Sequence, residues 1–426
     1  MLSQVLVYKL VAGALGKAGF SEYAVARRVS SLVQPLLLLG LAVGMPRYIA
    51  LAEARGKTEP SNRYFNATVA VTVSATLVCS ALFAMFGHPL SFVFFGSSQY
   101  IGLLPPLATM LIGLTLHGVM YAYLRGRLAM WQANSAQFAN MCVVPLLVFV
   151  AHPRSARAVL WITGAGWTLF AALGLLLVTP IAKFNFRFNA EIRQLLRYGV
   201  QRVPGDFAFM ALFALPTLIV THVGGLPNGG MTALSISIVS MITGVFAPAG
   251  IILLPKVSRS LSLGALGQLR QEIMLLRNLA ILIPAAGILV IELGANLILR
   301  VYLGRDFVAA ASILRVSTFA ALPLGVFCAM RSVTDAVYDN AVNTVNLLVV
   351  LAAFGCAGGL ELVLHASTVV VLWTFVGSAA LLAVLTNRDI QKIIDKGGFP
   401  SAGPAVAARA HDEHCLCDGE PALRPQ

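Results

Sequence analysis

Charged side chains are scarce in this sequence. Asp, Glu, Lys and Arg together make up 11% of the 426 residues, whereas soluble domains contain about 25%. Apolar residues make up 58% and gather in long runs that few charges interrupt. This composition excludes an ordinary soluble domain and predicts a polytopic membrane protein.

Features of several enzyme classes are also missing. No GxxxxGK[ST] motif is present, which argues against direct ATP drive. The predicted outer loops are short, the longest being about 297–307, whereas a saccharide polymerase or ligase should carry a long outer loop with catalytic residues. Cys79, Cys142, Cys328 and Cys356 lie in apolar segments, where a thiol behaves as a small hydrophobe, so we predict no disulfide framework. We expect a protein that is not an enzyme, with no cofactor and no nucleic-acid partner.

The end of the chain lacks apolar periodicity. From Lys396 onward it is rich in Gly, Pro, Ala and charge, which predicts a disordered tail over 396–426. His411, His414, Cys415 and Cys417 are close together there. Their spacing is not that of closed metal sites, so we predict no metal role for them.

A long stretch of the first half returns in the second half. Residues 19–56 run from a Gly-containing turn through an apolar helix to Pro46-Arg47, and residues 225–264 run in the same way to Pro255-Lys256. The two prolines are 209 positions apart (255 − 46 = 209). A repeat of this length predicts two related helical bundles, a common plan of secondary transporters with a site between the halves.

Polar landmarks recur at nearly the same spacing, and apolar bias does not explain them. The polar pairs are Arg125, Asn134 and Asn140 with Arg331, Asn340 and Asn346, each 206 positions apart. Phe95-Gly96 and Leu303-Gly304 recur in the same way, 208 positions apart. The sequence therefore indicates a tandem duplication.

Twelve apolar segments are predicted to be transmembrane helices, because lipid leaves backbone groups without partners outside a helix or a closed barrel. We expect an all-α polytopic protein with two six-helix bundles. The predicted spans are 2–16, 25–49, 65–87, 103–124, 133–152 and 158–180 in the first half, and 203–223, 231–255, 276–296, 308–330, 341–362 and 366–387 in the second.

These spans define four predicted regions. Residues 1–182 form an N-terminal bundle, 183–202 an amphipathic cytoplasmic connector, 203–395 a C-terminal bundle and 396–426 the tail. The first span offers about 15 residues where about 20 are needed. We therefore expect that the start codon lies upstream or that the reading frame is truncated.

Positive charge is distributed unevenly between alternate loops. One side carries most of the Lys and Arg, among them the cations of the 47–63, 183–202 and 256–277 loops. The other side carries few, including Lys17 and the pair Arg27 and Arg28. The positive-inside rule predicts that both termini are cytoplasmic.

Several short motifs resemble those of a known family. In the first half they are GlyPheSerGluTyr and the helix ending LeuGlyLeuAlaValGlyMetProArgTyrIleAla. In the second half they lie at 197–204, 255–259 and 302–307. The chain up to about residue 395 is similar to bacterial polysaccharide transporters, from the superfamily that includes MATE-type multidrug extruders and peptidoglycan-precursor flippases.

The resemblance implies a V-shaped fold of two bundles around a central cavity. It implies a flippase that moves an undecaprenyl-pyrophosphate-linked oligosaccharide to the outer leaflet for lipopolysaccharide or exopolysaccharide synthesis. The expected partners are that lipid-linked cargo, membrane lipids, and a polymerase and glycosyltransferases of the same pathway. Twelve helices suit the polysaccharide branch, because the peptidoglycan-precursor branch typically has two more.

An anionic cargo of this kind would be stabilised by intramembrane cations. A charge near the bilayer centre costs at least about 2.5–3.5 kcal/mol, so the cations that lie there are functional candidates. The candidate substrate-binding residues are Lys9, Arg28, Arg47, Lys256 and Arg315. The alternative for Arg47 and Lys256 is snorkelling to headgroups; Arg28 could anchor lipid phosphates at the outer surface, and Arg315 could face water.

Intramembrane acids are fewer. Asp206 is the ion-coupling candidate, although an ion pair with Arg202, four residues earlier on the same helix face, is the preferred alternative. Glu292 and Glu361 are expected at solvated outer ends.

The rival function is a cation-coupled multidrug exporter of the MATE type. It would favour acidic residues in its cavity, whereas this chain has 17 acidic and 30 basic residues and a net charge of +13. The excess of positive charge favours an anionic cargo.

Overall fold

The fold was examined in a computed structural model of the 426-residue chain. The structure describes residues 2–54, 58–178, 189–246, 257, 266–338 and 341–395. The predicted tail at 396–426 and the start of the predicted connector at 183–188 lie outside the described residues.

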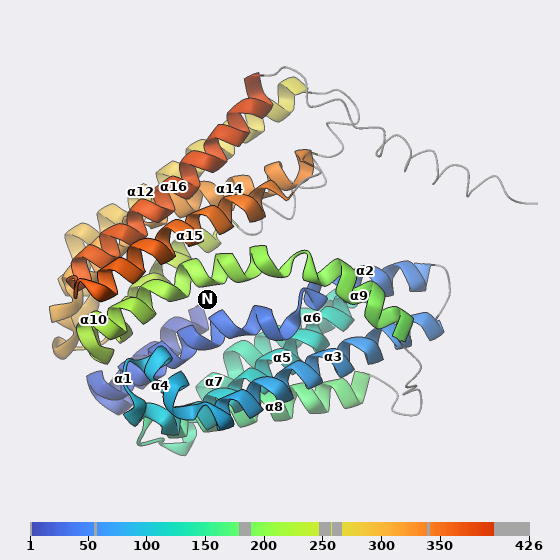
Figure 1. The fold of residues 1–426 in the computed structure, drawn as a ribbon, viewed down its shortest axis with the longest axis horizontal. Helices are drawn as coiled ribbons and strands as arrows, with labels where there is room; N and C mark the ends of the chain where they lie inside the picture. The colour runs from blue at the N-terminus through green and yellow to red at the C-terminus, as the bar shows by residue number, and fades with distance from the viewer. Residues whose placement is uncertain are drawn as a thin grey trace, which may run out of the picture.

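The described residues form helices joined by short turns (Figure 1). The first half contains α1 (Leu2–Leu38), α2 (Leu41–Ala54), α3 (Thr58–Met85), α4 (Gly87–Phe95), α5 (Leu104–Gly126), α6 (Met130–Phe138), α7 (Val144–Leu147) and α8 (Ala156–Val178). The second half contains α9 (Asn189–Val200), α10 (Val203–Gly244), α12 (Leu266–Tyr302), α13 (Ala311–Thr318), α14 (Ala321–Val337), α15 (Val342–Val363) and α16 (Thr368–Asp395).

The outer surface of the bundles is apolar, as a lipid-facing surface must be. Leu77 on α3 is 63% exposed and Leu293 on α12 is 81% exposed. Among the described residues, eight helices are long and apolar enough to cross a membrane, or ten when two bent pairs are each counted as one span. The all-α polytopic fold is thus confirmed.

Two of these spans each hold two of the twelve predicted segments, because each contains a glycine with non-helical torsion angles. Gly16 in α1 has φ 64° and ψ −167°, and Gly225 in α10 has φ 78° and ψ 165°. Such angles are nearly restricted to glycine. Beyond Gly225 the chain folds back, since a Cβ on Gly229 would lie 1.9 Å from the Thr221 hydroxyl.

The duplication is visible in the backbone. Gly16 and Gly225 are 209 positions apart, the spacing of the repeated prolines. Gly96 and Gly304, paired from the sequence, also both have positive φ, of 74° and 115°. The two halves therefore turn at equivalent glycines.

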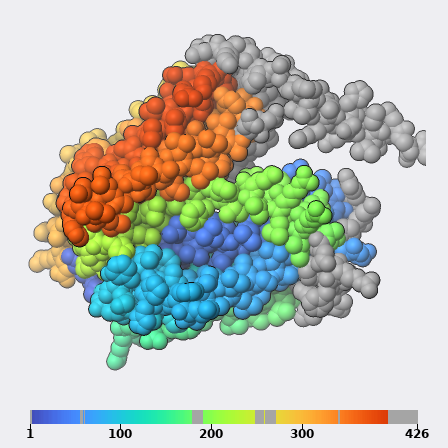
Figure 2. Space-filling view, in the orientation of Figure 1, coloured from blue at the N-terminus to red at the C-terminus, as the bar shows by residue number. Residues whose placement is uncertain are grey.

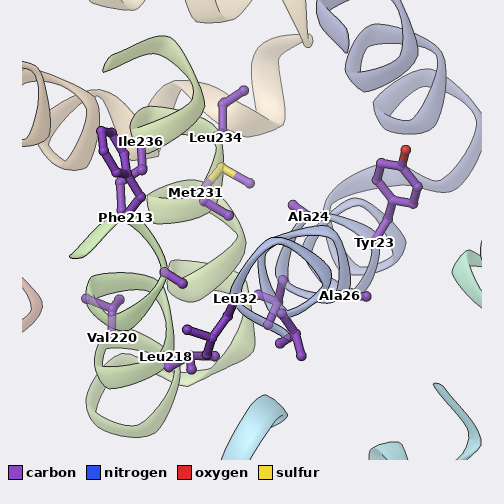
Figure 3. Packing of buried hydrophobic residues seen from close by; sticks show 14 of the residues in the cluster. Tyr23, Ala24, Ala26, Leu32, Phe213, Leu218, Val220, Met231, Leu234 and Ile236 are labelled. Atoms are coloured by element: carbon purple, nitrogen blue, oxygen red, sulfur yellow. The ribbon is translucent and has the colours of Figure 1, made fainter. Parts of the chain in front are cut away.

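The two repeats meet through α1 and α10. Figure 3 shows α1 beside α10, with Leu32 of α1 on the side toward Leu218 of α10, and Tyr23 and Ala26 on the far side of α1. Arg28 and Ser237, which form a hydrogen bond, are themselves 209 positions apart. Ser21 and Gly230 have the same spacing, and a Cβ on Gly230 would lie 2.5 Å from Ser21. Equivalent positions thus touch each other, as at an isologous twofold interface.

The bundles diverge from this contact like the arms of a V. One arm contains α3, α5 and α8, and the other contains α12, α14, α15 and α16 (Figure 1). The space-filling view shows a hollow between the arms at the end where α2 ends and α9 lies (Figure 2). The V expected from the resemblance is present, and it opens toward the end that carries Arg47 and Arg202, cations of the predicted cytoplasmic side.

The opposite end of the V is closed by contacts between the repeats. The His222 ring nitrogen Nε2 lies 3.0 Å from the Val93 carbonyl oxygen. The Tyr302 hydroxyl donates to the Val5 carbonyl at 2.5 Å, and the rings of Phe20 and Phe307 meet edge to face at 5.3 Å. Access to the interior is therefore from the predicted cytoplasmic side.

Candidate functional site

A cavity of about 430 Å³ lies inside the first bundle and is bounded on one side by α10. Its walls come from α1, α5, α6 and the second part of α10. None of its lining residues is acidic, and two of them, Arg27 and Arg28, are arginines. Two unneutralised cations make this cavity the strongest candidate site in the described part of the chain.

Gly16 sets where the two arginines lie along their helix. Because the chain turns there, a continuous helix from Lys17 carries Arg28 twelve residues, or about 18 Å, beyond the turn at 1.5 Å per residue. The predicted start of this helix near residue 25 is therefore too late in the sequence. The outer-side position of Arg27 and Arg28 stays a prediction, but Arg28 is partly buried and its side chain is bonded to α10.

Arg28 is bonded to the other repeat. Its Nη2 donates to the Ala233 carbonyl at 3.0 Å and to the Ser237 hydroxyl at 2.8 Å, both on α10. The Tyr8 hydroxyl lies 3.3 Å from the same Ser237 hydroxyl. These bonds tie α1 to α10 at the wall of the cavity.

Arg27 has a different environment. Its guanidinium lies over the ring of Trp167 on α8, 4.9 Å from the ring centroid. Trp167 is 1% exposed, and its Nε1 has no partner among the described residues. Gly113 of α5 and Gly164 of α8 let the two helices approach closely, since a Cβ on Gly113 would lie 2.6 Å from the Trp167 Cβ. This packing fixes the ring beneath Arg27.

Neutral hydrogen-bonding groups complete the cavity. His117 Nε2 lies 2.7 Å from Gln137 Oε1, while His117 Nδ1 is buried without a partner in the described structure. Gln34 also lines the cavity. Next to Gln137, residues Ala139–Val143 form a π-helix, a feature frequent at functional sites. Within it, Asn140 is fully buried, and neither of its side-chain polar atoms has a partner among the described residues.

Three of the other predicted substrate-binding residues are described by the structure, and none of the three lines this cavity. Lys9 is exposed on α1. Arg47 is exposed on α2, 5.2 Å from the centroid of the Tyr198 ring. Arg315 lies 3.9 Å from Glu292. Lys256 falls outside the described residues. Among the described members of the predicted set, only Arg28 lines the cavity.

Sequence reasoning missed Arg27, His117, Gln137 and Trp167 as parts of one site. Arg27 could have been considered because it is the neighbour of Arg28 in the sequence. Trp167, however, is 140 positions away from Arg27 and lies in an apolar segment. Nothing in a linear pattern brings the two together.

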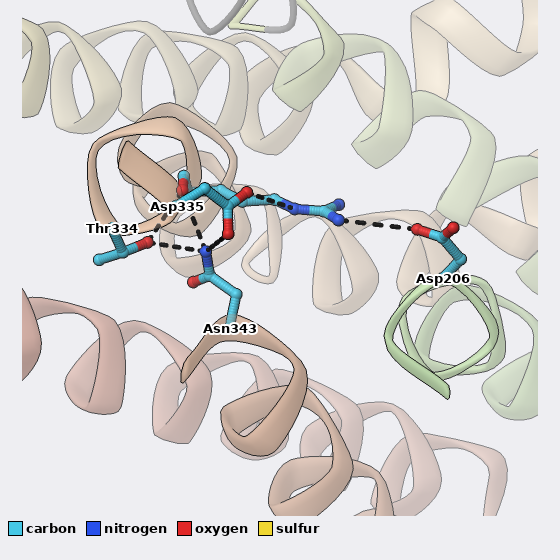
Figure 4. Close-up of polar contacts among 5 residues, drawn as sticks. Asp206, Thr334, Asp335 and Asn343 are labelled. Carbon is cyan, nitrogen blue, oxygen red and sulfur yellow. Dashed lines mark hydrogen bonds and ion pairs between the residues drawn. The ribbon is translucent and has the colours of Figure 1, made fainter. Parts of the chain in front are cut away.

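A second polar cluster lies in the other bundle (Figure 4). Arg331 Nη2 is 3.7 Å from Asp206 Oδ1, and Arg331 Nε is 3.8 Å from Asp335 Oδ2. Asn343 Nδ2 donates to the Asp335 carboxylate and to the Thr334 hydroxyl, each at 2.7 Å. Unlike the cavity in the first bundle, this cluster contains its own counter-charges.

Two expectations about acids are corrected here. Asp206 pairs with Arg331 instead of Arg202, because the Arg202 side chain turns back to donate to the Tyr198 hydroxyl at 3.4 Å. Glu361 is not solvated but 7% exposed, and its Oε1 accepts a hydrogen bond from the Thr374 hydroxyl on α16. Packing of α15 against α16, invisible in the sequence, encloses this carboxyl group.

Comparison with known proteins shows which solved structures are similar to this architecture. No family model matches the chain, and no curated protein matches it. Solved structures do match. An inward-facing multidrug resistance MATE family transporter of the MOP superfamily has a TM-score of 0.70 and 13% identity, covering 94% of this chain and 96% of its own. The chain is thus similar in fold to this transporter of the MOP superfamily.

Two further structures support this MOP fold. The lipid II flippase MurJ in an inward closed conformation has a TM-score of 0.65 and 12% identity, covering 91% of this chain and 85% of its own. An outward-facing MATE family transporter has a TM-score of 0.58 and 13% identity, with 92% of each chain covered.

Proposed function

We propose that this MOP-fold protein is a flippase that moves an undecaprenyl-pyrophosphate-linked oligosaccharide from the cytoplasmic to the outer leaflet by alternating access. The observation that carries the proposal is the cavity of the first bundle, which has two guanidinium groups and no acid among its lining residues. A lipid pyrophosphate is a compact anion, and guanidinium groups bind phosphate through strong paired hydrogen bonds.

The neutral lining supports a saccharide next to the phosphate. Gln34, His117 and Gln137 offer both donors and acceptors, as hydroxyl-rich sugars require. Such a cavity would hold the head of the cargo while the polyprenyl chain stays in lipid. The lipid II flippase MurJ shares the fold, which supports a lipid-linked cargo by analogy of fold.

The remaining parts of the proposal rest on the distribution of positive charge between the loops and on the order of the predicted segments along the chain. The protein lies in the inner membrane with both termini cytoplasmic, and it consists of bundles at 1–182 and 203–395 joined by a connector. Lys9, Arg47, Lys256 and Arg315 are proposed as further cargo contacts in other stages of the cycle. Membrane lipids, a polysaccharide polymerase and glycosyltransferases are the proposed partners in cell-surface polysaccharide synthesis.

The second candidate is a cation-coupled multidrug exporter. It is favoured by the fold shared with MATE family transporters and by the carboxylates of Asp206 and Asp335 in the second bundle. It is disfavoured by Arg331, which lies within ion-pair distance of both carboxylates and offsets one of their two negative charges.

The experiment is mass spectrometry of polyprenyl-linked saccharides extracted from cells depleted of the protein. The flippase proposal predicts that an undecaprenyl-pyrophosphate oligosaccharide accumulates, and its mass identifies the glycan. An unchanged lipid pool together with new sensitivity to cationic dyes would favour the multidrug exporter instead.

A further inference from the structure

Arg27 and Arg28 are adjacent in the sequence, but the structure uses them differently. Arg28 donates to a backbone carbonyl and a hydroxyl of α10. Arg27 lies over the ring of Trp167 and makes no hydrogen bond or ion pair within the described residues. Both line the same cavity.

We infer that Arg27 is the residue that binds the anionic head of the cargo, that Trp167 positions it, and that Arg28 instead holds the two repeats together. The assignment rests on the proposed function, because it takes the cargo to be a polyprenyl pyrophosphate. It gives Arg27, which sequence reasoning passed over, the role that was expected of Arg28.

The geometry of a guanidinium group is the physical reason for this assignment. Its N–H donors all lie in the plane of the group, while its faces are free to stack on an aromatic ring. Trp167 covers one face of Arg27, and this contact consumes no N–H donor. The edge of Arg27 therefore keeps its capacity for paired hydrogen bonds to a phosphate, and no lining acid competes for it.

Trp167 can position Arg27 because its own place is fixed by packing. The ring is 1% exposed, and its backbone lies against Gly113, where a Cβ would be 2.6 Å from the Trp167 Cβ and 2.8 Å from the Thr168 nitrogen. The Thr168 hydroxyl also lies 3.3 Å from the Thr109 carbonyl oxygen, a further bond from α8 to α5. A long, flexible arginine is thus held by a rigid platform, which reduces the entropy lost on binding the cargo.

Arg28 has the opposite character. Its Nη2 is shared between the Ala233 carbonyl and the Ser237 hydroxyl, across the contact where the repeats meet at equivalent positions. Loss of Arg28 would leave the Ala233 and Ser237 partners without this donor and would loosen α1 from α10. Replacement of Arg28 should therefore change the balance of conformations more than the recognition of the anion.

The test combines two measurements on the purified full-length protein. The first is binding of undecaprenyl pyrophosphate by native mass spectrometry, with uncharged undecaprenol as the control lipid. We expect Arg27→Gln to weaken pyrophosphate binding by about tenfold or more, without changing undecaprenol binding, and Arg27→Lys to retain part of it. Trp167→Leu should weaken pyrophosphate binding severalfold although Arg27 is intact, and Trp167→Phe should do so less.

The second measurement is the distance between spin labels on exposed positions of α6 and α16, Trp131 and Val384, without ligand. Arg28→Gln and Ser237→Ala should shift the distance distribution, whereas Arg27→Gln and Trp167→Phe should leave it unchanged. A monodisperse elution profile checks that each variant folds.

The outcomes separate the inference from the proposed function. Normal pyrophosphate binding by Arg27→Gln, or binding lost only in Arg28→Gln, would overturn the assignment of roles. Failure of the wild-type protein to bind undecaprenyl pyrophosphate above the level of undecaprenol would overturn the proposed function itself.

Discussion

The two repeats share a backbone plan but differ in how their polar groups are satisfied. In the first repeat, Arg27 faces a cavity without an acid, and Asn140 is buried without a partner in the described structure. In the second, Arg331 lies between Asp206 and Asp335. The first bundle thus leaves two arginines at a cavity without a lining acid, whereas in the second Arg331 lies within ion-pair distance of two carboxylates.

One pair of residues at equivalent positions of the duplication illustrates the contrast between the two repeats. Asn140 and Asn346 match in the duplication, yet Asn346 donates to Asp389 at 2.9 Å, and Asp389 is also 3.1 Å from Lys392. Asn140 has no such acid within the described residues. Asn343 Oδ1 and Glu361 Oε2 of the second repeat are also buried without a partner in the described structure, so the difference between the repeats is one of charge. The first repeat places arginines at a cavity without a lining acid, whereas the second places its arginine between carboxylates.

The largest expected effect is on transport through the first bundle. Arg27→Gln should lower the rate at which lipid-linked oligosaccharide reaches the outer leaflet by about tenfold or more, because a charged hydrogen bond to the cargo is lost. Arg125→Gln is the matched control: Arg125 belongs to the same bundle, but it is exposed and lies over the Tyr121 ring at 5.5 Å. The rate can be measured in proteoliposomes, and equal losses in both variants would contradict a specific role for the cavity.

The second largest effect is expected on the packing of α5 against α8. Gly113→Ala should destabilise the fold by about 1–3 kcal/mol, since its Cβ would press on Trp167 and the backbone of α8. Gly355→Ala in α15 is the control, because nothing lies within 4 Å of a Cβ there, and it should be neutral or slightly stabilising. Thermal unfolding in detergent measures both. Similar shifts for the two variants would show that α5 and α8 are not as tightly packed as described.

A third prediction uses the equivalence of the turns. Gly16→Ala and Gly225→Ala should each cost about 1–3 kcal/mol, because alanine is strained at these torsion angles. No neighbour lies within 4 Å of a Cβ on Gly16, and the nearest atom to one on Gly225 is 3.7 Å away, so backbone strain is the common cause. Thermal unfolding should give comparable losses. A loss of stability in only one of the two variants would contradict the equivalence of the two turns.

The smallest effect is expected at Asp206. Its ion pair with Arg331 is partly exposed, at 38% and 31% for the two side chains, so Asp206→Asn should cost less than about 1 kcal/mol of stability. Because Arg331 occupies the carboxylate, we expect transport by this variant to keep its dependence on protons or sodium. Abolished ion dependence at normal protein levels would instead support Asp206 as the ion-coupling residue.

The sequence predicted the features that composition and periodicity encode. The apolar segments and the duplication could be predicted because lipid enforces helices and because repeated glycines, prolines and arginines persist at a fixed spacing. The location of Arg27 and Arg28 could not, because the helix was predicted to start at residue 25 whereas the turn lies at Gly16. The turn at Gly16 places both residues about three turns into the helix and not at its start.

The candidate site itself was less predictable. Arg28 was among the predicted cargo-binding cations and lines the cavity, but the partners that decide its role, Ala233 and Ser237, are more than 200 positions away. The pairing of Arg27 with Trp167 likewise depends on the close approach of α5 and α8 at Gly113. Contacts of this kind are set by tertiary packing, which the linear pattern of one helix does not contain.

The central claim is that the first bundle, and not the second, holds the anionic head of the cargo. The most direct measurement is site-specific photocrosslinking, with a photoreactive amino acid placed at Gln34 or Tyr121 in the cavity, or at Phe209 beside Arg331, and radiolabelled undecaprenyl-pyrophosphate oligosaccharide as the probe. Our account predicts crosslinks from Gln34 and Tyr121, reduced by Arg27→Gln, and none above background from Phe209. Crosslinks from Phe209 alone would contradict it.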